Sequence, residues 1–134
     1  MSWYEKSDIV NSEVEDIILS YDLNRESIVE AKLIGEVEEL ISENAQKFKL
    51  ILEGRQIELT VYHIIPFWRN GELIEDNCGI VEVGDELLCI DPEELTVRKE
   101  KVVEIELGMT DNTPVRHPKS SNGYYFVNGI LLHD

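Results

Sequence analysis

Basic residues are scarce in this chain of 134 residues, in which 12 Lys and Arg stand against 28 Asp and Glu and the formal net charge is −16. Such a charge repels nucleic-acid phosphates, so we expect no nucleic-acid partner. No apolar run approaches the roughly 18 residues of a membrane span, and the first ten residues lack the features of a signal peptide. We therefore expect a cytoplasmic monomer with no membrane partner.

Cysteine and histidine are also few. Cys78 and Cys89 lie in apolar stretches without C-x-x-C spacing, which favours reduced, buried thiols over a zinc site. His63, His117 and His133 are too scattered to form an H-x-x-x-H pair, and no glycine-rich phosphate loop is present. We therefore expect no metal and no cofactor.

Strand-like stretches rich in Val, Ile, Leu and Tyr dominate the chain, several with apolar and polar residues in alternation. No linker or low-complexity segment separates them, so residues 1–134 are predicted to form a single all-β domain. Short helices are predicted at 35–46 and 91–95, the second with Asp91 as its cap. The predicted strands cover 15–22, 27–40, 47–54, 55–67, 79–91, 95–107 and 123–132.

An internal similarity links the two halves of the chain. The segment "VEDIILSYD" at 14–22 matches "VGDELLCID" at 83–91, with Asp22 opposite Asp91 at an offset of 69 residues. The same offset aligns the apolar residues of 28–34 with those of 97–103. This pattern indicates a pseudo-two-fold β fold that arose by duplication.

Three short patterns lie at the front, middle and end of the chain. The front reads "SWYEKSDIV" from Ser2, the middle has Thr60-x-x-His63 at the end of an alternating strand that follows Gly54, and the last residues read "VNGILLHD". Together these patterns resemble the Hint domain, the fold of inteins and of the hedgehog autoprocessing domain. The resemblance covers essentially the whole chain.

The Hint resemblance implies a horseshoe-shaped, pseudo-two-fold, all-β fold with its termini side by side in central strands. The chain has no stretch long enough for a homing endonuclease, so the resemblance implies a minimal intein. Its partners would be the flanking extein polypeptides in cis, and its activity would be a single-turnover splicing or autocleavage of its own peptide bonds.

The resemblance also assigns roles at the front of the reaction. Ser2 would attack the carbonyl of Met1 and convert the peptide bond into an ester, His63 would protonate the departing nitrogen, and Thr60 would orient the same peptide. Thr and His three residues apart in one strand point to opposite faces. The strand must therefore bend between Thr60 and His63, or Thr60 must act through its backbone.

At the other end, the resemblance implies that His133 assists release of the downstream segment. Asp134 stands where inteins carry Asn, and its carboxylate is a poorer nucleophile for ring closure, although it can form an anhydride. Asp111, in "MTDNTPV" at 109–115, is the candidate for tuning the nucleophile and coupling the two ends.

Two other interpretations remain open from the sequence. The first alternative is a catalytically inert Hint module, in which Ser2 and Asp134 disable the chemistry. The chain's charge of −16 also fits an acidic immunity-type protein that neutralises a basic toxin.

Overall fold

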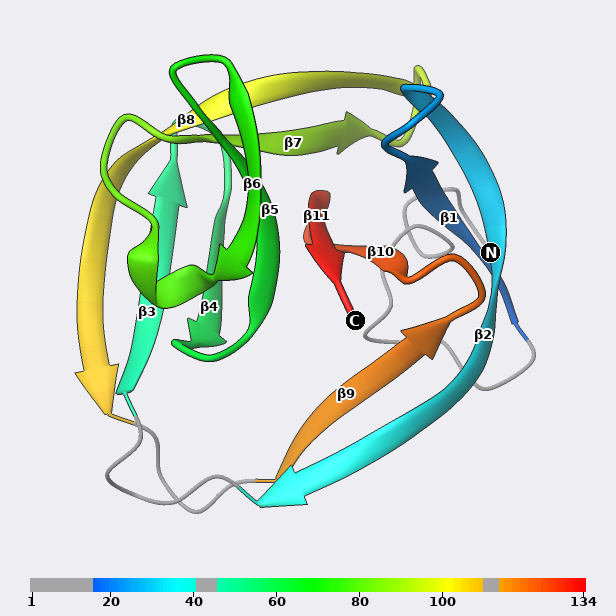
Figure 1. The fold of residues 1–134 in the computed structure, drawn as a ribbon, viewed down its shortest axis with the longest axis horizontal. Helices are drawn as coiled ribbons and strands as arrows, with labels where there is room; N and C mark the ends of the chain where they lie inside the picture. The colour runs from blue at the N-terminus through cyan, green and yellow to red at the C-terminus, as the bar shows by residue number, and fades with distance from the viewer. Residues whose placement is uncertain (1–15, 41–45, 110–113) are drawn as a thin grey trace.

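The computed structural model describes residues 16–40, 46–109 and 114–134, and almost all of them lie in or between β-strands (Figure 1). Within these ranges the one helical element is the 3₁₀ helix η2 (Cys78–Ile80). The strands, in chain order, are β1 (Ile17–Asp22), β2 (Ser27–Leu40), β3 (Gln46–Leu52), β4 (Gln56–Thr60), β5 (Ile64–Arg69), β6 (Glu72–Asn77), β7 (Glu86–Asp91), β8 (Thr96–Met109), β9 (Pro114–Ser120), β10 (Tyr124–Val127) and β11 (Ile130–His133).

The long strands β2 and β8 curve around the outside of a horseshoe-like ring, and the last strand ends near its centre (Figure 1). One sheet has the order β1-β2-β9, and a larger one has the order β10-β11-β7-β8-β3-β4 with β5 and β6 attached through β7. Among the described residues, no helix is long and apolar enough to cross a membrane. The all-β, curled architecture predicted from the sequence is therefore confirmed.

The internal similarity is a repeated hairpin. Strands β7 and β8 begin and end 69 residues after β1 and β2. In the turns, Asp22 accepts hydrogen bonds from the amides two and three residues on, and Asp91 does the same. Each turn ends on a residue with positive φ, Glu26 at 52° and Leu95 at 55°. The pseudo-two-fold inferred from the sequence is thus present down to the hydrogen bonds of its turns.

The repeated hairpins carry a β-bulge at the same place. The register of β2 against β9 shifts between Leu33 and Gly35, which leaves Ile34 as the extra residue. The register of β8 against β3 shifts where Glu104 and Val102 face consecutive residues, which leaves Val103 as the extra one. Ile34 and Val103 are both exposed and again 69 positions apart. A bulge increases the local twist of a strand, so the matched pair helps both long strands curve.

The two halves exchange strands. The long strand of the first hairpin, β2, pairs with β9 from the second half of the chain, while β8 pairs with β3 from the first half. The hairpin formed by β10 and β11, which we call the terminal hairpin, lies between the halves, with β10 against β1 and β11 against β7. The core is correspondingly shared and includes Leu33, Leu50, Phe67, Leu87 and Ile130, each completely buried.

Several sequence predictions of local structure are wrong. Residues 35–40 continue β2 rather than forming a helix, and residues 92–95 form a turn because Asp91 caps a turn and not a helix. The predicted strand 55–67 is two strands, β4 and β5, and the predicted strand 123–132 is the terminal hairpin, folded at Asn128–Gly129. Within 79–91 only β7 is a strand, and β6 and β9 were not predicted.

Candidate functional site

The T-x-x-H pattern forms a tight turn rather than part of one strand. Strand β4 ends at Thr60, the amide of His63 donates to the carbonyl of Thr60 at 3.1 Å, and β5 begins at Ile64. The turn releases His63 from the strict alternation of a strand. Of the two alternatives left by the sequence, a bend in the strand or action of Thr60 through its backbone, the bend is present.

The helix η2 brackets this turn from the other side. The thiol of Cys78 donates to the carbonyl of Thr60 at 3.0 Å, and the amide of Cys78 donates to the carbonyl of His63 at 2.8 Å. The amide of Gly79 adds a bond to the carbonyl of Val61 at 3.0 Å. A Cβ on Gly79 would lie 3.1 Å from that of Val61, so glycine allows the close approach. Burial raises the pKa of the Cys78 thiol to about 12, so the thiol keeps its proton and acts as a donor.

His63 contacts the terminal hairpin through a buried tyrosine. The Nε2 atom of His63 lies 3.2 Å from the hydroxyl of Tyr125, and the two rings meet edge-on with centroids 6.4 Å apart. Tyr125 is 2% exposed. Its burial and, secondarily, the charge of Asp134 raise the pKa of its hydroxyl. The tyrosine therefore stays protonated and connects mid-chain His63 to the end of the chain.

His133 and Asp134 are held by backbone contacts around the end of β9. The amide of Ser120 donates to Asp134 Oδ2 at 3.0 Å, and the amide of Asp134 donates to the carbonyl of Gly123 at 2.8 Å. The Nδ1 atom of His133 lies 2.8 Å from the backbone carbonyl oxygen of Asp134. The ring of His133 packs edge-on against Tyr124, with centroids 4.6 Å apart. Both residues are partly buried.

Tyr124 ties this region to β6. Its hydroxyl donates to Glu75. Burial, the hydrogen bond to Glu75 and nearby negative charge all raise the pKa of Tyr124. The ring that packs on His133 is therefore fixed from its far end.

Four of the six predicted site residues fall within the described part of the chain. Thr60 and His63 share the turn, and His133 and Asp134 share the end of the terminal hairpin, with Tyr125 between the two pairs. Ser2 and Asp111 lie outside the described residues. Among the described residues, no group of three or more His, Cys, Asp and Glu side chains has the geometry of a metal site.

Sequence reasoning missed two residues of this arrangement, Tyr125 and Cys78. A tyrosine in a strongly apolar strand needs a partner for its hydroxyl, so "GYYF" at 123–126 did carry a signal. Cys78 carried none, because its contact with the T-x-x-H turn exists only when β6 returns beside β5.

Comparison with known proteins places this geometry in context. No protein-family model matches the chain, and no curated protein matches it in sequence. Solved structures do match. An intein from a hyperthermophile superposes with a TM-score of 0.78 at 18% identity, over 100% of this chain and 88% of that one.

Two further structures agree. The PabCDC21-1 intein superposes with a TM-score of 0.79 at 18% identity, over 96% of this chain and 77% of that one. The bacterial intein-like domain from Clostridium thermocellum superposes with a TM-score of 0.68 at 20% identity, over 92% of this chain and 85% of that one. The expected resemblance is thus confirmed for the fold, and this chain has the Hint fold of inteins.

Proposed function

We propose that this chain is a minimal intein-type domain that rearranges and cleaves the peptide bonds at its own two ends. It would act as a single-domain monomer on flanking polypeptides in cis, without an endonuclease insertion. The observation that carries the proposal is the contact of His63 with Tyr125, which joins the T-x-x-H turn to the hairpin that ends in His133 and Asp134. The fold shared with solved inteins supports it.

In the first step, Ser2 Oγ attacks the carbonyl carbon of Met1, the C–N bond of Met1–Ser2 breaks, and an ester forms. The hydroxyl proton of Ser2 passes to His63, and His63 gives a proton to the departing amine, so that His63 is neutral again at the end of the step. Because Tyr125 keeps its own proton, its oxygen can accept a hydrogen bond from Nε2–H of His63. In that tautomer Nδ1 would be the atom that takes the proton from Ser2 and delivers it to the amine.

Thr60 and Asp111 have supporting roles in this proposal. Thr60 terminates β4, and its carbonyl accepts hydrogen bonds from the Cys78 thiol and the His63 amide, so its backbone is held in the turn that carries His63. It would orient the scissile peptide, and Asp111 would tune the nucleophile and couple the two ends.

At the downstream end, the side-chain carboxylate of Asp134 attacks the main-chain carbonyl carbon of the same residue and forms a cyclic anhydride. The C–N bond to the following residue breaks, and the leaving amine takes a proton from His133. The distance of 2.8 Å from His133 Nδ1 to the carbonyl oxygen of Asp134 supports this role, since a donor at that position polarises the bond under attack. Water then hydrolyses the anhydride and restores Asp134.

The test is a fusion with a folded reporter domain at each end, incubated after purification and followed by mass spectrometry of the products. We expect slow cleavage at Met1–Ser2 and after Asp134, and faster reaction with S2C and D134N, which supply a thiolate and an amide. His63→Ala should slow N-terminal cleavage by about 100-fold or more, the usual contribution of a general acid. Tyr125→Phe should slow it less, because it removes only the partner of His63.

Two matched outcomes would contradict the proposal. Cleavage at Met1–Ser2 that is unchanged in His63→Ala would remove the role given to this residue. A precursor that stays intact even with both S2C and D134N would favour the inert Hint module. In that case capture of basic peptides at low salt, weakening as salt rises, would identify the acidic binding protein.

A further inference from the structure

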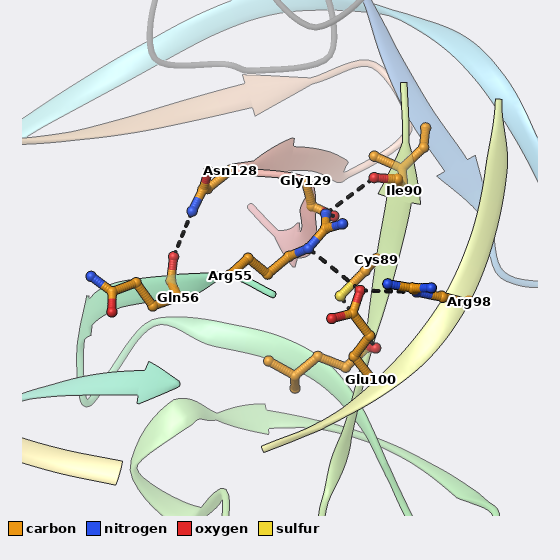
Figure 2. Close-up of polar contacts among 9 residues, drawn as sticks. Arg55, Gln56, Cys89, Ile90, Arg98, Glu100, Asn128 and Gly129 are labelled. Carbon is orange, nitrogen blue, oxygen red and sulfur yellow. Dashed lines mark hydrogen bonds and ion pairs between the residues drawn. The ribbon is translucent and has the colours of Figure 1, made fainter. Parts of the chain in front are cut away.

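The turn of the terminal hairpin is held from outside by the β3–β4 hairpin. Nη1 of Arg55 donates to the carbonyls of Ile90, at 3.1 Å, and Gly129, at 3.2 Å (Figure 2). The side-chain amide of Asn128 donates to the carbonyl of Gln56 at 2.7 Å. We call the contacts of Arg55 and Gln56 with this turn the hairpin clamp.

Gly129 is fitted to the clamp. Its φ is +74°, and an added Cβ would lie 2.0 Å from Nη1 of Arg55 and 3.3 Å from the carbonyl oxygen of Ile90. The amide of Ile90 also donates to the carbonyl of Gly129 at 2.8 Å. The turn is therefore covered by β7 on one side and by the guanidinium of Arg55, and a side chain at position 129 would displace that guanidinium.

A buried carboxylate fixes the guanidinium. The Nε atom of Arg55 lies 3.4 Å from Glu100 Oε2, and Nε of Arg98 donates to the same oxygen at 3.2 Å (Figure 2). The side chains of Glu100 and Arg55 are 8% and 21% exposed, whereas that of Arg98 is 75% exposed. Arg55 is thus the inner partner of Glu100, and Arg98 closes the pair from the solvent side.

The clamp and the site share strand β4. This strand begins at Gln56, beside the turn of the terminal hairpin, and ends at Thr60, in the turn that carries His63. The terminal hairpin therefore contacts residues 55–63 at two places. Its turn contacts Arg55 and Gln56, and Tyr125, near the open end of the hairpin, contacts His63.

We propose that Arg55 is a positioning residue that sets the place of His133 and Asp134 relative to His63 by fixing the turn of the terminal hairpin. This inference rests on the proposed self-cleavage for its chemical consequence, but the clamp itself is measurable without any reaction. One rigid guanidinium binds two backbone carbonyls, that of Ile90 in β7 and that of Gly129 in the turn of the terminal hairpin, which lysine cannot imitate fully.

The experiment uses the full chain with its reporter fusions and the activating changes S2C and D134N. Arg55→Met should slow cleavage after Asp134 at least tenfold and slow nucleophile-induced cleavage at residue 2 less than threefold, because the turn around His63 keeps its bonds to Cys78 and Gly79. Arg55→Lys should recover part of the loss. Arg98→Met, which touches Glu100 but not the hairpin, is the matched control and should change neither rate by more than twofold.

Glu100→Gln separates positioning from folding. In Arg55→Met the buried carboxylate of Glu100 keeps only the exposed Arg98 as an ionic partner. The double variant Arg55→Met/Glu100→Gln removes the unpaired charge and should regain thermal stability without regaining C-terminal cleavage. Recovery of both together would reduce Arg55 to a partner of Glu100 and overturn the proposal.

Amide hydrogen exchange, followed by NMR, tests whether Arg55 holds the turn of the terminal hairpin, independently of cleavage. In Arg55→Met, exchange of the Ile90 amide should quicken at least tenfold, while that of the Leu33 amide, bonded to Asp16 in the other half, should stay within twofold. An Ile90 amide that is equally protected in both proteins would overturn the clamp. Quickened exchange in a chain that never cleaves would uphold the clamp and count against the proposed function alone.

Discussion

The hairpins β1–β2 and β7–β8 share a framework and differ on the faces that meet the terminal hairpin. Their turns, lengths and bulges coincide at an offset of 69 residues. At equivalent buried positions, however, the first hairpin has Ser20 where the second has Cys89, and Ala31 where the second has Glu100. The repeat therefore preserves the turns, strand lengths and bulges of the two hairpins. The buried faces that contact the terminal hairpin differ between them.

Side chains of the first hairpin and of the end of β9 together dock β10. The hydroxyls of Ser20 and Ser120 lie within 3.0 Å of Asn122 Oδ1 and of the carbonyl of Tyr124, and the Asn122 amide reaches the carbonyl of Tyr21 at 3.3 Å.

The second hairpin docks β11 with its backbone, through Ile90 and Gly129, and needs Arg55 to complete the contact. One half thus holds the terminal hairpin by a polar cluster, and the other holds it by its turn.

The largest expected effect is from Gly129→Ala, which disturbs the docking of the terminal hairpin on β7 and leaves its docking on β1 intact. A positive φ and the collision with Arg55 should together lower the free energy of unfolding by about 3 kcal/mol. Gly71→Ala is the control, because Gly71 has φ +81° but no atom near its added Cβ. It should cost about 1 kcal/mol. Equal losses in urea denaturation would contradict the role of the close approach.

Asp85 and Asp16 test an asymmetry at the start of the two hairpins. Asp85 is buried and bonded to Arg69 at 2.8 and 3.0 Å, whereas its equivalent, Asp16, is only partly buried. Asp85→Ala should cost about 2 kcal/mol and Asp16→Ala less. Both variants keep the backbone bond at this position, because the amide of Leu33 donates to the backbone carbonyl of residue 16 and the amide of Val102 to that of residue 85.

Unfolding measured at acid pH tests whether the ion pair of Asp85 with Arg69 causes the stability loss in Asp85→Ala. Burial alone pushes the pKa of Asp85 up, but the bonds from Arg69 and the Glu82 amide outweigh it and leave the pKa below its usual value. This contribution is present above about pH 4 and is lost as pH falls through the folded-state pKa. The deficit of Asp85→Ala should therefore shrink in acid, and a deficit constant with pH would exclude the ion pair as its source.

The two turn aspartates should behave alike. Asp22→Ala and Asp91→Ala each remove two side-chain bonds to turn amides, and each should cost about 1 kcal/mol. Parallel thermal unfolding of the two variants measures the difference. A gap beyond about 1 kcal/mol would mean that the repeated turns are no longer energetically equivalent.

The smallest effects are expected at the bulges. Ile34 and Val103 are exposed, and threonine keeps their branching at Cβ. Ile34→Thr and Val103→Thr should each change stability by no more than about 0.5 kcal/mol. A larger loss in only one of them, in the same denaturation assay, would show that the bulges pack differently despite their common register.

Much of this fold was predictable because its repeat is local. The alternating apolar residues and the turn aspartates at Asp22 and Asp91 fix two hairpins. The strands predicted at 27–40 and 95–107 agree with β2 and β8 to within two residues, although a helix was also predicted from residue 35. The exchange of β3 and β9 between the halves was not predictable, because it depends on pairing between residues far apart in the sequence. The Asn128–Gly129 turn was available as a two-residue hairpin signal and was passed over inside an apolar run.

The site was predictable in its residues but not in its connections. His63, His133 and Asp134 followed from short patterns, whereas the turn after Thr60 was hidden because Val61 and Tyr62 extend the apolar pattern of β4. Tyr62 is in fact 73% exposed, so it does not continue the buried face of a strand. The roles of Ser2 and Asp111 remain predictions.

The exchange of β3 and β9 bears on how the protein is made. A nascent chain that has emerged only as far as β6 has synthesised β2 and β3 without the strands that cover their remaining edges, β9 and β8. Both long seams of the ring must then close late and together, which favours slow, all-or-none acquisition of the native state. During translation, we expect a chaperone to bind the unpaired edges of β2 and β3.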